Sequence, residues 1–356
     1  MMAVLCGQIL VVGVAGVTLA PDEASALSRG ERGGVVLFRR NVGRDAAGCA
    51  EVAELTQAVR GARPDALIAI DQEGGRVVRI GPPAFGLPPM RKIGELDDVA
   101  FTERLAVAQA RELSALGITM SFAPVADIHT RADNPIIGDR AFAESPEKVA
   151  TFARAWARGL ARGGVLSCAK HFPGHGDTTV DSHLALPRVE RDAAGLEAVE
   201  IAAFRSLARD VDAMMSAHVV YPALDERPAT LSRTICTDLL RTKLGFDGVL
   251  FCDDLEMKAI QLPVGEAAVL AVGAGCDAIL VCSRADLAEE AYVALVHECE
   301  KSEAFRVRIA EAHERVMKMR HRFPSIAVAP AALPGIFAAS TAIAGELAAR
   351  LGGLSA

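Results

Sequence analysis

Several signals of common functional classes are missing from this sequence of 356 residues. It has no cluster of lysines and arginines and a formal net charge of −7, so we expect neither nucleic acid nor an anionic membrane as a partner. It has no GxxxxGK[ST] motif, which excludes a phosphate-binding loop of that kind. Aromatic residues make up only 4%, but hydrophobic residues make up 51% and charged residues 23%, the balance of a globular protein with ample core.

The cysteines lack the spacing of a metal or redox motif. There are eight, no two form a CxxC pair, and several lie in apolar runs such as VLSCAK and AILVCS. Cysteine in such a run behaves as a small buried hydrophobic residue. Scattered thiols of this kind indicate a reducing compartment, and we expect a cytoplasmic protein.

The N-terminal segment lacks the basic residues of a signal peptide. MMAVLCGQILVVGVAGVTLA (1–20) is apolar, but the first basic residue is Arg29, and three glycines interrupt the run. We interpret 8–14 as a buried strand followed by a turn, with export as the alternative. No later uncharged apolar segment reaches the ~18 residues that a membrane span needs.

Eight short apolar runs recur along the chain, as expected for strands that are buried on both faces. They span 8–14, 34–38, 66–71, 120–125, 165–170, 213–218, 248–253 and 278–282. Stretches with helical periodicity separate most of them, at 46–62, 98–117, 145–164 and 195–211. This alternation predicts an α/β fold, a single-domain (β/α)8 TIM barrel over 1–322, with an open doubly wound sheet as the alternative.

The remaining segment, 323–356, is rich in Ala, Gly and Pro and carries little charge. We expect a packing or poorly ordered appendage, in which TAIAGELAARLGG could form a short helix. We assign it no chemistry.

Polar residues follow five of the predicted strands: Asp71, Asp127, Lys170, His218 and Asp253. In a barrel the carboxyl ends of the strands form one mouth, which holds the active site. Each residue alone is more often part of a structural ion pair. Five at equivalent positions predict a functional site.

The segment KHFPGHGDTTVDSH (170–183) has two interpretations. His171, His175 and His183 could bind a metal, but Pro173 and two glycines prevent the helix that would place a His-x3-His pair on one face. This argues against the metal site.

The second interpretation of this segment is proton transfer. Asp181 and His183 are two residues apart, so in extended chain they point to the same side. A carboxylate beside an imidazole fixes its tautomer and raises its basicity. A buried histidine satisfied by a nearby aspartate is the structural alternative, and spacing alone does not decide between them.

Three further segments carry candidate residues. GVLFCDDLEMKAI (248–260) places Asp253 at a strand end as a nucleophile or metal ligand, whereas Asp254 is expected to cap the helix LEMKAI. In DQEGGRVVR, Asp71 could accept hydrogen bonds from vicinal hydroxyls. Arg79 there, and Arg140 in DNPIIGDRAF, could donate to hydroxyl, carboxylate or amide oxygens. Each arginine alone is more often a surface or ion-pair residue.

These motifs together resemble glycoside hydrolase family 3, and closely its bacterial single-domain β-N-acetylglucosaminidases of peptidoglycan recycling. The matching stretches are DQEGGRVVR, SFAPVADI, NPIIGDRAF, KHFPGHGDTTVDSHLALP and GVLFCDDLEMKAI, in family order over most of the chain. Long motifs in order are more specific than one short pattern. The family's fold is a (β/α)8 barrel, in agreement with the strand count. Cys252, where Ser is common, and the apolar tail depart from the pattern.

The resemblance implies a role for each candidate residue. Asp253 matches the nucleophile that forms a covalent glycosyl-enzyme, and His183, assisted by Asp181, matches the general acid/base. The residues matching those that hold a terminal N-acetylglucosamine are Asp71, Arg79, Arg140, Lys170 and His171. It implies a retaining exo-β-N-acetylglucosaminidase acting on GlcNAc-1,6-anhydroMurNAc and its peptides, with no metal or cofactor; we expect a monomer. A phosphorylase, a non-catalytic sugar-binding barrel and a metal-dependent hydrolase are the alternatives.

Overall fold

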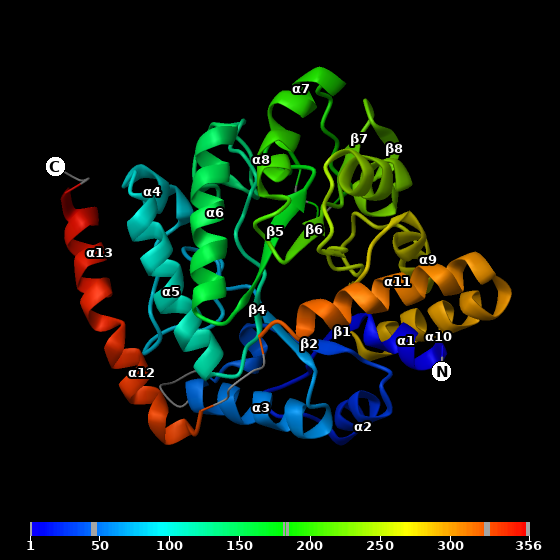
Figure 1. Cartoon of the computed structure of the whole chain (residues 1–356), viewed down its shortest axis with the longest axis horizontal. Helices are drawn as coiled ribbons and strands as arrows, with labels where there is room; N and C mark the ends of the chain where they lie inside the picture. The colour runs from blue at the N-terminus through cyan, green and yellow to red at the C-terminus, as the bar shows by residue number, and fades with distance from the viewer. Residues whose placement is uncertain (1, 44–47, 181, 183–184, 324–327, 354–356) are drawn as a thin grey trace.

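The chain forms eight parallel strands that close into a barrel surrounded by helices (Figure 1). The computed structural model describes residues 2–43, 48–180, 182, 185–323 and 328–353. The strands lie in the order β10-β1-β2-β3-β4-β5-β6-β9, and an isolated parallel bridge between Phe251 and Ala278 joins the two ends. The bounds are β1 Leu10–Gly13, β2 Gly34–Leu37, β3 Leu67–Ile70, β4 Met120–Ser121, β5 Leu166–Phe172, β6 Ala213–Ser216, β9 Val249–Phe251 and β10 Ile279–Val281.

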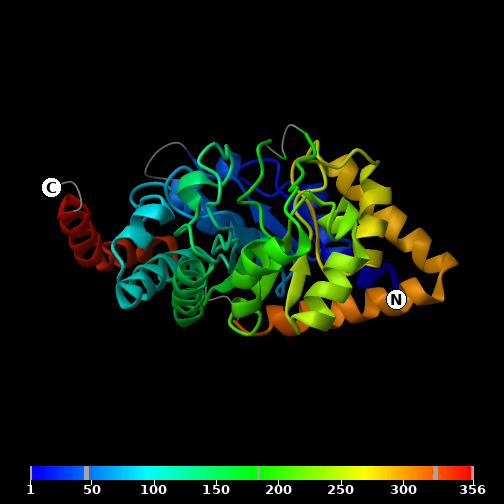
Figure 2. The same ribbon diagram turned by 90° about the horizontal axis from the view of Figure 1, so that it is seen from above.

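Helices follow most strands and cover the outside of the barrel (Figures 1 and 2). The α-helices around the barrel are α1 Met2–Gln8, α2 Pro21–Arg29, α3 Gly48–Ala62, α4 Met90–Glu95, α5 Val99–Ala115, α6 Pro146–Arg162, α7 Ala193–Ala198, α8 Glu200–Leu207, α9 Val264–Ala274, α10 Ala285–Lys301 and α11 Glu303–Arg320. A π-helix, Thr234–Lys243, takes the position between β6 and β9, after a small hairpin of β7 Val220–Tyr221 and β8 Asp225–Pro228.

The predicted (β/α)8 barrel is confirmed, since each of the eight apolar runs overlaps one strand of the ring. Two local predictions are wrong. The first run begins in helix α1, so that β1 starts at Leu10 and not at residue 8. The helix predicted over 195–211 is divided at Val199 into α7 and α8, because the backbone of Val199 leaves the helical region (φ −115°, ψ −81°).

Local signals explain the helix that follows β4. The Ser145 side chain accepts a hydrogen bond from the backbone N–H of Lys148, and Pro146 occupies the first turn, both favourable at a helix start. Gly159 lets α6 approach α5 closely, because a Cβ there would lie 2.5 Å from the Cβ of Ala106. Apart from the half-buried end of β1 at Val12 and Gly13, the barrel strands are buried along their length, which explains their continuous apolar sequence.

The C-terminal segment packs along α5, at the opposite end of the molecule from α10 and α11 (Figures 1 and 2). The predicted short helix is present as α13 Thr341–Gly353, preceded by α12 Leu333–Ala339. Phe337 and Leu347 are buried, and Arg350 pairs with Asp98 at 2.8 Å. The stretch Pro330–Gly352 is long and apolar enough to cross a membrane by length and composition alone (mean hydropathy 1.4). The boundary at 322/323 stays a prediction.

Candidate active site

A cavity of about 190 Å³ opens among the carboxyl ends of the strands. Six of the residues predicted from the sequence line it: Asp71, Arg79, Arg140, Lys170, His171 and Asp253. Phe122, which also lines it, packs edge-on against Phe251, the last residue of β9 (ring centroids 5.5 Å apart). Asp181 and His183 lie outside the described residues, so their predicted roles stay predictions.

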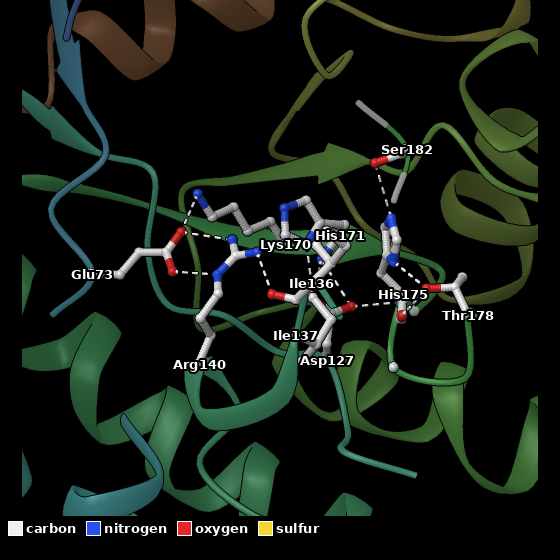
Figure 3. Close-up of polar contacts among 12 residues, drawn as sticks. Glu73, Asp127, Ile136, Ile137, Arg140, Lys170, His171, His175, Thr178 and Ser182 are labelled. Carbon is white, nitrogen blue, oxygen red and sulfur yellow. Dashed lines mark hydrogen bonds and ion pairs between the residues drawn. The ribbon is translucent and has the colours of Figure 1, made fainter. Parts of the chain in front are cut away.

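Five charged side chains form one ion-pair network on the β3 side of this cavity. Lys170 Nζ lies 2.7 Å from Asp71 Oδ1 and 2.6 Å from Glu73 Oε1. Arg79 Nη2 donates to the second oxygen of Asp71 at 3.0 Å. Arg140 holds Glu73 with two hydrogen bonds of 2.8 and 2.9 Å, as Figure 3 shows. Three cations thus surround two carboxylates, and the excess positive charge offers N–H donors to a polar ligand.

The network keeps its two buried members, Glu73 and Lys170, ionised. Burial by itself would raise the pKa of Glu73, but the charges of Arg140 and Lys170 outweigh it and hold that pKa well below its usual range. Burial likewise opposes the charge of Lys170, whose pKa is nevertheless raised by Asp71 and Glu73. Each carboxylate is held by two cations, since Asp71 pairs with Arg79 and Lys170 and Glu73 pairs with Arg140 and Lys170, and this shared pairing fixes the positions of the charges.

Two consecutive residues of β5, Lys170 and His171, both line the cavity. Successive side chains of a regular strand point to opposite faces. Here the pairing of β5 with β6 is irregular between Lys170 and Phe172, and a bulge of this kind re-aims a side chain. The sequence had suggested that β5 ends at Lys170. In the structure β5 continues to Phe172, so Lys170 lies within the strand.

Asp127, which follows β4, is fully buried and holds the start of the loop after β5 (Figure 3). Its Oδ2 lies 2.7 Å from His171 Nδ1, and its Oδ1 accepts the backbone N–H of His175 at 2.6 Å. A carboxylate at Nδ1 fixes the imidazole tautomer, which makes Nε2 of His171 the ring nitrogen that can meet a ligand. Tyr221 donates to the carbonyl of Gly174 at 2.7 Å and supports the same loop.

Asp253 stands just beyond the end of β9, where its Oδ1 accepts the backbone N–H of Asp254 at 2.8 Å. Burial alone would raise the pKa of Asp253. The imidazoles of His218 and His171 outweigh that effect and lower it, with smaller help from the Asp254 N–H and Lys170. An ionised carboxylate beside N–H donors is chemically suited to attack an electrophilic carbon.

The prediction for Asp254 is wrong. No helix begins at Leu255; the chain makes a turn, and Asp254 Oδ1 accepts the backbone N–H groups of Glu256 (3.1 Å) and Cys282 (3.2 Å). Asp254 therefore lines the cavity together with Asp253, whereas the sequence had suggested that one of the two turns outward. Burial raises the pKa of Asp254 to about 7.

The sequence argument missed three residues of the cavity wall: Glu73, His175 as a hydrogen-bonding group, and Ser182. Glu73 stands two residues after Asp71, a spacing that could have placed both carboxylates on one side. His175 was weighed as a metal ligand. In the structure its Nδ1 and Nε2 contact the hydroxyls of Thr178 (2.8 Å) and Ser182 (3.2 Å).

Comparisons with known proteins show which family the chain belongs to. The family model for the glycosyl hydrolase family 3 N-terminal domain matches residues 2–319. A protein named beta-hexosaminidase from Neisseria meningitidis is 42% identical over 293 residues, which cover 79% of this chain and 80% of that protein. A beta-hexosaminidase from Chromobacterium violaceum is 39% identical over 349 residues, which cover 94% and 96%.

Solved structures are similar in fold and sequence. NagZ from Neisseria gonorrhoeae in complex with N-trifluoroacetyl-D-glucosamine has a TM-score of 0.81 at 34% identity, covering 96% of this chain and 98% of that one. A family 3 β-N-acetylglucosaminidase from Paenibacillus has a TM-score of 0.84 at 38% identity; this chain spans only 62% of that longer chain. The chain therefore belongs to glycosyl hydrolase family 3, as a β-N-acetylhexosaminidase of that family.

Proposed function

We propose that this enzyme removes terminal β-linked N-acetylglucosamine from peptidoglycan fragments, GlcNAc-1,6-anhydroMurNAc and its peptides, with retention of configuration. The observation that carries the proposal is the ionised, half-buried Asp253 in a cavity walled by fixed hydrogen-bonding groups. The complex of the N. gonorrhoeae relative with an N-acylated glucosamine supports the same sugar class for this chain.

The groups around Asp253 suit a neutral, hydroxyl-rich ligand. Asp71 can accept hydrogen bonds from hydroxyls, while Lys170, Arg79 and Arg140 can donate to hydroxyl or amide oxygens, and His171 can offer Nε2. Because Asp71 and Lys170 are fixed to each other at 2.7 Å, they present an acceptor and a donor at a set separation. Adjacent hydroxyls of a sugar ring carry this pairing of donor and acceptor.

The mechanism has two displacement steps. His183 as imidazolium, assisted by Asp181, gives its proton to the glycosidic oxygen while a carboxylate oxygen of Asp253 bonds to the anomeric carbon and the C–O bond to the aglycone breaks. Neutral His183 then takes a proton from water, whose oxygen attacks the same carbon and displaces Asp253. Two inversions leave the sugar in its original β configuration. No step requires a metal or a cofactor.

Hydrolysis of 4-nitrophenyl N-acetyl-β-D-glucosaminide by wild type, Asp253→Ala and His183→Ala tests these roles. Asp253→Ala should lose at least about a thousandfold in kcat/KM, because no covalent intermediate can form. His183→Ala should lose less on this activated leaving group, which needs little protonation. The exposed Asp238→Ala serves as the matched control and should retain wild-type activity. An undiminished Asp253→Ala would overturn the proposal.

The natural substrate and acceptor need a second experiment. GlcNAc-1,6-anhydroMurNAc should be cleaved, and NMR during the reaction should detect the β-anomer of N-acetylglucosamine before the α-anomer. Initial appearance of the α-anomer would contradict retention. The assay is repeated in phosphate buffer, where a sugar 1-phosphate product would assign the chain as a phosphorylase instead.

We also propose that the enzyme works as a monomer in the cytoplasm. All eight cysteines are free and buried, and the Sγ atoms of Cys6 and Cys299 lie 3.5 Å apart without a bond. Eight cysteines without a disulfide are typical of proteins from a reducing compartment. Cell fractionation and the molar mass in solution test the two statements, and an enzyme found outside the cytoplasm or as a stable dimer would contradict them.

A further inference from the structure

The backbone N–H and both ring nitrogens of the buried His175 each have a hydrogen-bond partner (Figure 3). It is 2% exposed and sits in the loop that follows β5. Its backbone N–H donates to Asp127, its Nδ1 contacts Thr178 Oγ1 at 2.8 Å, and its Nε2 contacts Ser182 Oγ at 3.2 Å. The ring therefore connects the start of the loop to a residue seven positions further along.

A neutral imidazole fits this position. Burial lowers the pKa of His175 to about 4, and the nearby charge of His171 acts in the same direction. A neutral ring has one N–H donor and one nitrogen acceptor, which matches two hydroxyl groups, each able to donate or accept. The connection to Ser182 therefore persists across the physiological pH range.

Asp127, which holds His175, also holds His171. Asp127 accepts hydrogen bonds from the Nδ1 of His171 and from the backbone N–H groups of both histidines. Asn134 adds a second attachment, because its amide nitrogen donates to the carbonyl oxygens of His175 and Gly176, each at 3.0 Å. Its side-chain oxygen accepts the backbone N–H groups of Ile136 (2.9 Å) and Ile137 (2.7 Å).

Ser182 is the residue between Asp181 and His183 in the sequence, and it is 3% exposed and lines the cavity. We propose that His175 is a positioning residue, which through its hydrogen bond to Ser182 sets the location of the acid/base segment relative to the sugar-binding residues. This inference rests on the proposed function, since it assumes that residue 183 moves the proton. Correct placement of a catalytic group contributes strongly to rate, and an error of about 1 Å can cost about a hundredfold.

The test uses Ser182→Ala, which removes one hydroxyl and leaves His175 in place. Its kcat/KM is compared on two substrates, 4-nitrophenyl N-acetyl-β-D-glucosaminide and GlcNAc-1,6-anhydroMurNAc, whose unactivated leaving group requires protonation. We expect the loss on the disaccharide to exceed the loss on the nitrophenyl substrate by about tenfold or more. Ser182→Thr, which restores a hydroxyl, should recover most of that difference.

The exposed Ser206→Ala on α8 is the matched control, because its hydroxyl donates only within its own helix, to Ala202 O at 3.1 Å. His175→Gln, which retains a donor and an acceptor, is the second variant. Like Ser182→Ala, it should lose more kcat/KM on the disaccharide than on the nitrophenyl substrate. Equal losses on both substrates in Ser182→Ala, or none, would overturn the inference and leave the proposed function intact. Absence of wild-type turnover on both substrates would overturn the proposed function and the inference with it.

Discussion

Replacing Glu73 by Gln should destabilise the protein through the two cations that it holds. Glu73 is 2% exposed, and its carboxylate lies 2.6 Å from Lys170 Nζ while it accepts two hydrogen bonds from Arg140. Gln has nearly the same shape, but it is neutral and turns an –NH2 group toward one of the cations. The change therefore removes charge without creating a cavity, and its effect reports electrostatics alone.

The structure sets the size of this effect. Removing one partner of a buried ion pair costs about 3 to 5 kcal/mol, because the other charge stays buried and uncompensated. Lys170 keeps Asp71 at 2.7 Å, and Arg140 keeps a hydrogen bond to the carbonyl of Ile136 at 3.2 Å. Both remaining contacts reduce the loss, so we expect about 3 kcal/mol, at the lower end of that range.

Urea unfolding, followed by the fluorescence of the single, buried Trp156, measures this loss at pH 7. Glu95→Gln is the matched control: among the residues that the structure describes, Glu95 pairs with Lys92 alone, on the surface, and the loss should stay within about 0.5 kcal/mol. Because the folded-state pKa of Glu73 is depressed, the wild-type advantage is present above its ordinary value of 4.5 and shrinks as the pH falls below it. A loss below about 1 kcal/mol at pH 7 would refute the reasoning.

Three further predictions concern other parts of the molecule. Burial raises the pKa of Glu200 to about 7, and Arg191, 3.2 Å away, offsets this only in part. Because the folded-state pKa is raised, wild-type stability is lost as the pH rises from 4.5 through 7. Glu200→Gln should therefore be more stable than wild type at pH 8 by up to about 3 kcal/mol and equal to it near pH 4.5. Thermal melts at both pH values check this, and a shift independent of pH would contradict it. Removal of 323–356 should lower Tm by about 4 °C, as expected for roughly 2 kcal/mol of lost packing, but leave kcat unchanged. Loss of kcat would contradict a catalytic domain that ends at residue 322. Incubation with EDTA should change kcat/KM by less than about twofold, and an inactivation reversed by added Zn²⁺ would favour a metal-dependent mechanism.

The sequence was sufficient for the barrel and for most of the charged residues of the cavity wall. Strands buried on both faces need apolar residues throughout, and this makes them visible as runs between polar helices. The position of a polar residue directly after such a run then places it at the mouth. Asp71 and Asp253 are found in this way from local sequence alone, without knowledge of which residues lie beside them.

Contacts between distant segments could not be predicted in the same way. Glu73 and Arg140 are 67 positions apart, and nothing in the local pattern of either indicates that they pair. The turn at Asp254 was missed for a related reason: its oxygen binds the backbone of Cys282, 28 positions away, and this long-range contact replaces the helix cap that the local sequence favours. The irregular pairing at Lys170 likewise depends on the neighbouring strand β6.

The structure gives a reason why Asp253, and not Asp254, suits the role of nucleophile. Both carboxyl groups are half-buried at one cavity, and desolvation alone would raise the pKa of each. Asp253 has the imidazoles of His218 and His171 as neighbours, which lower its pKa below the usual range, whereas Asp254 faces the negative charges of Glu256 and Asp253 and has a pKa raised to about 7. Adjacent titratable groups whose environments separate their pKa values take different chemical roles. Only the first remains fully ionised at neutral pH, as a carboxylate must be to attack an anomeric carbon.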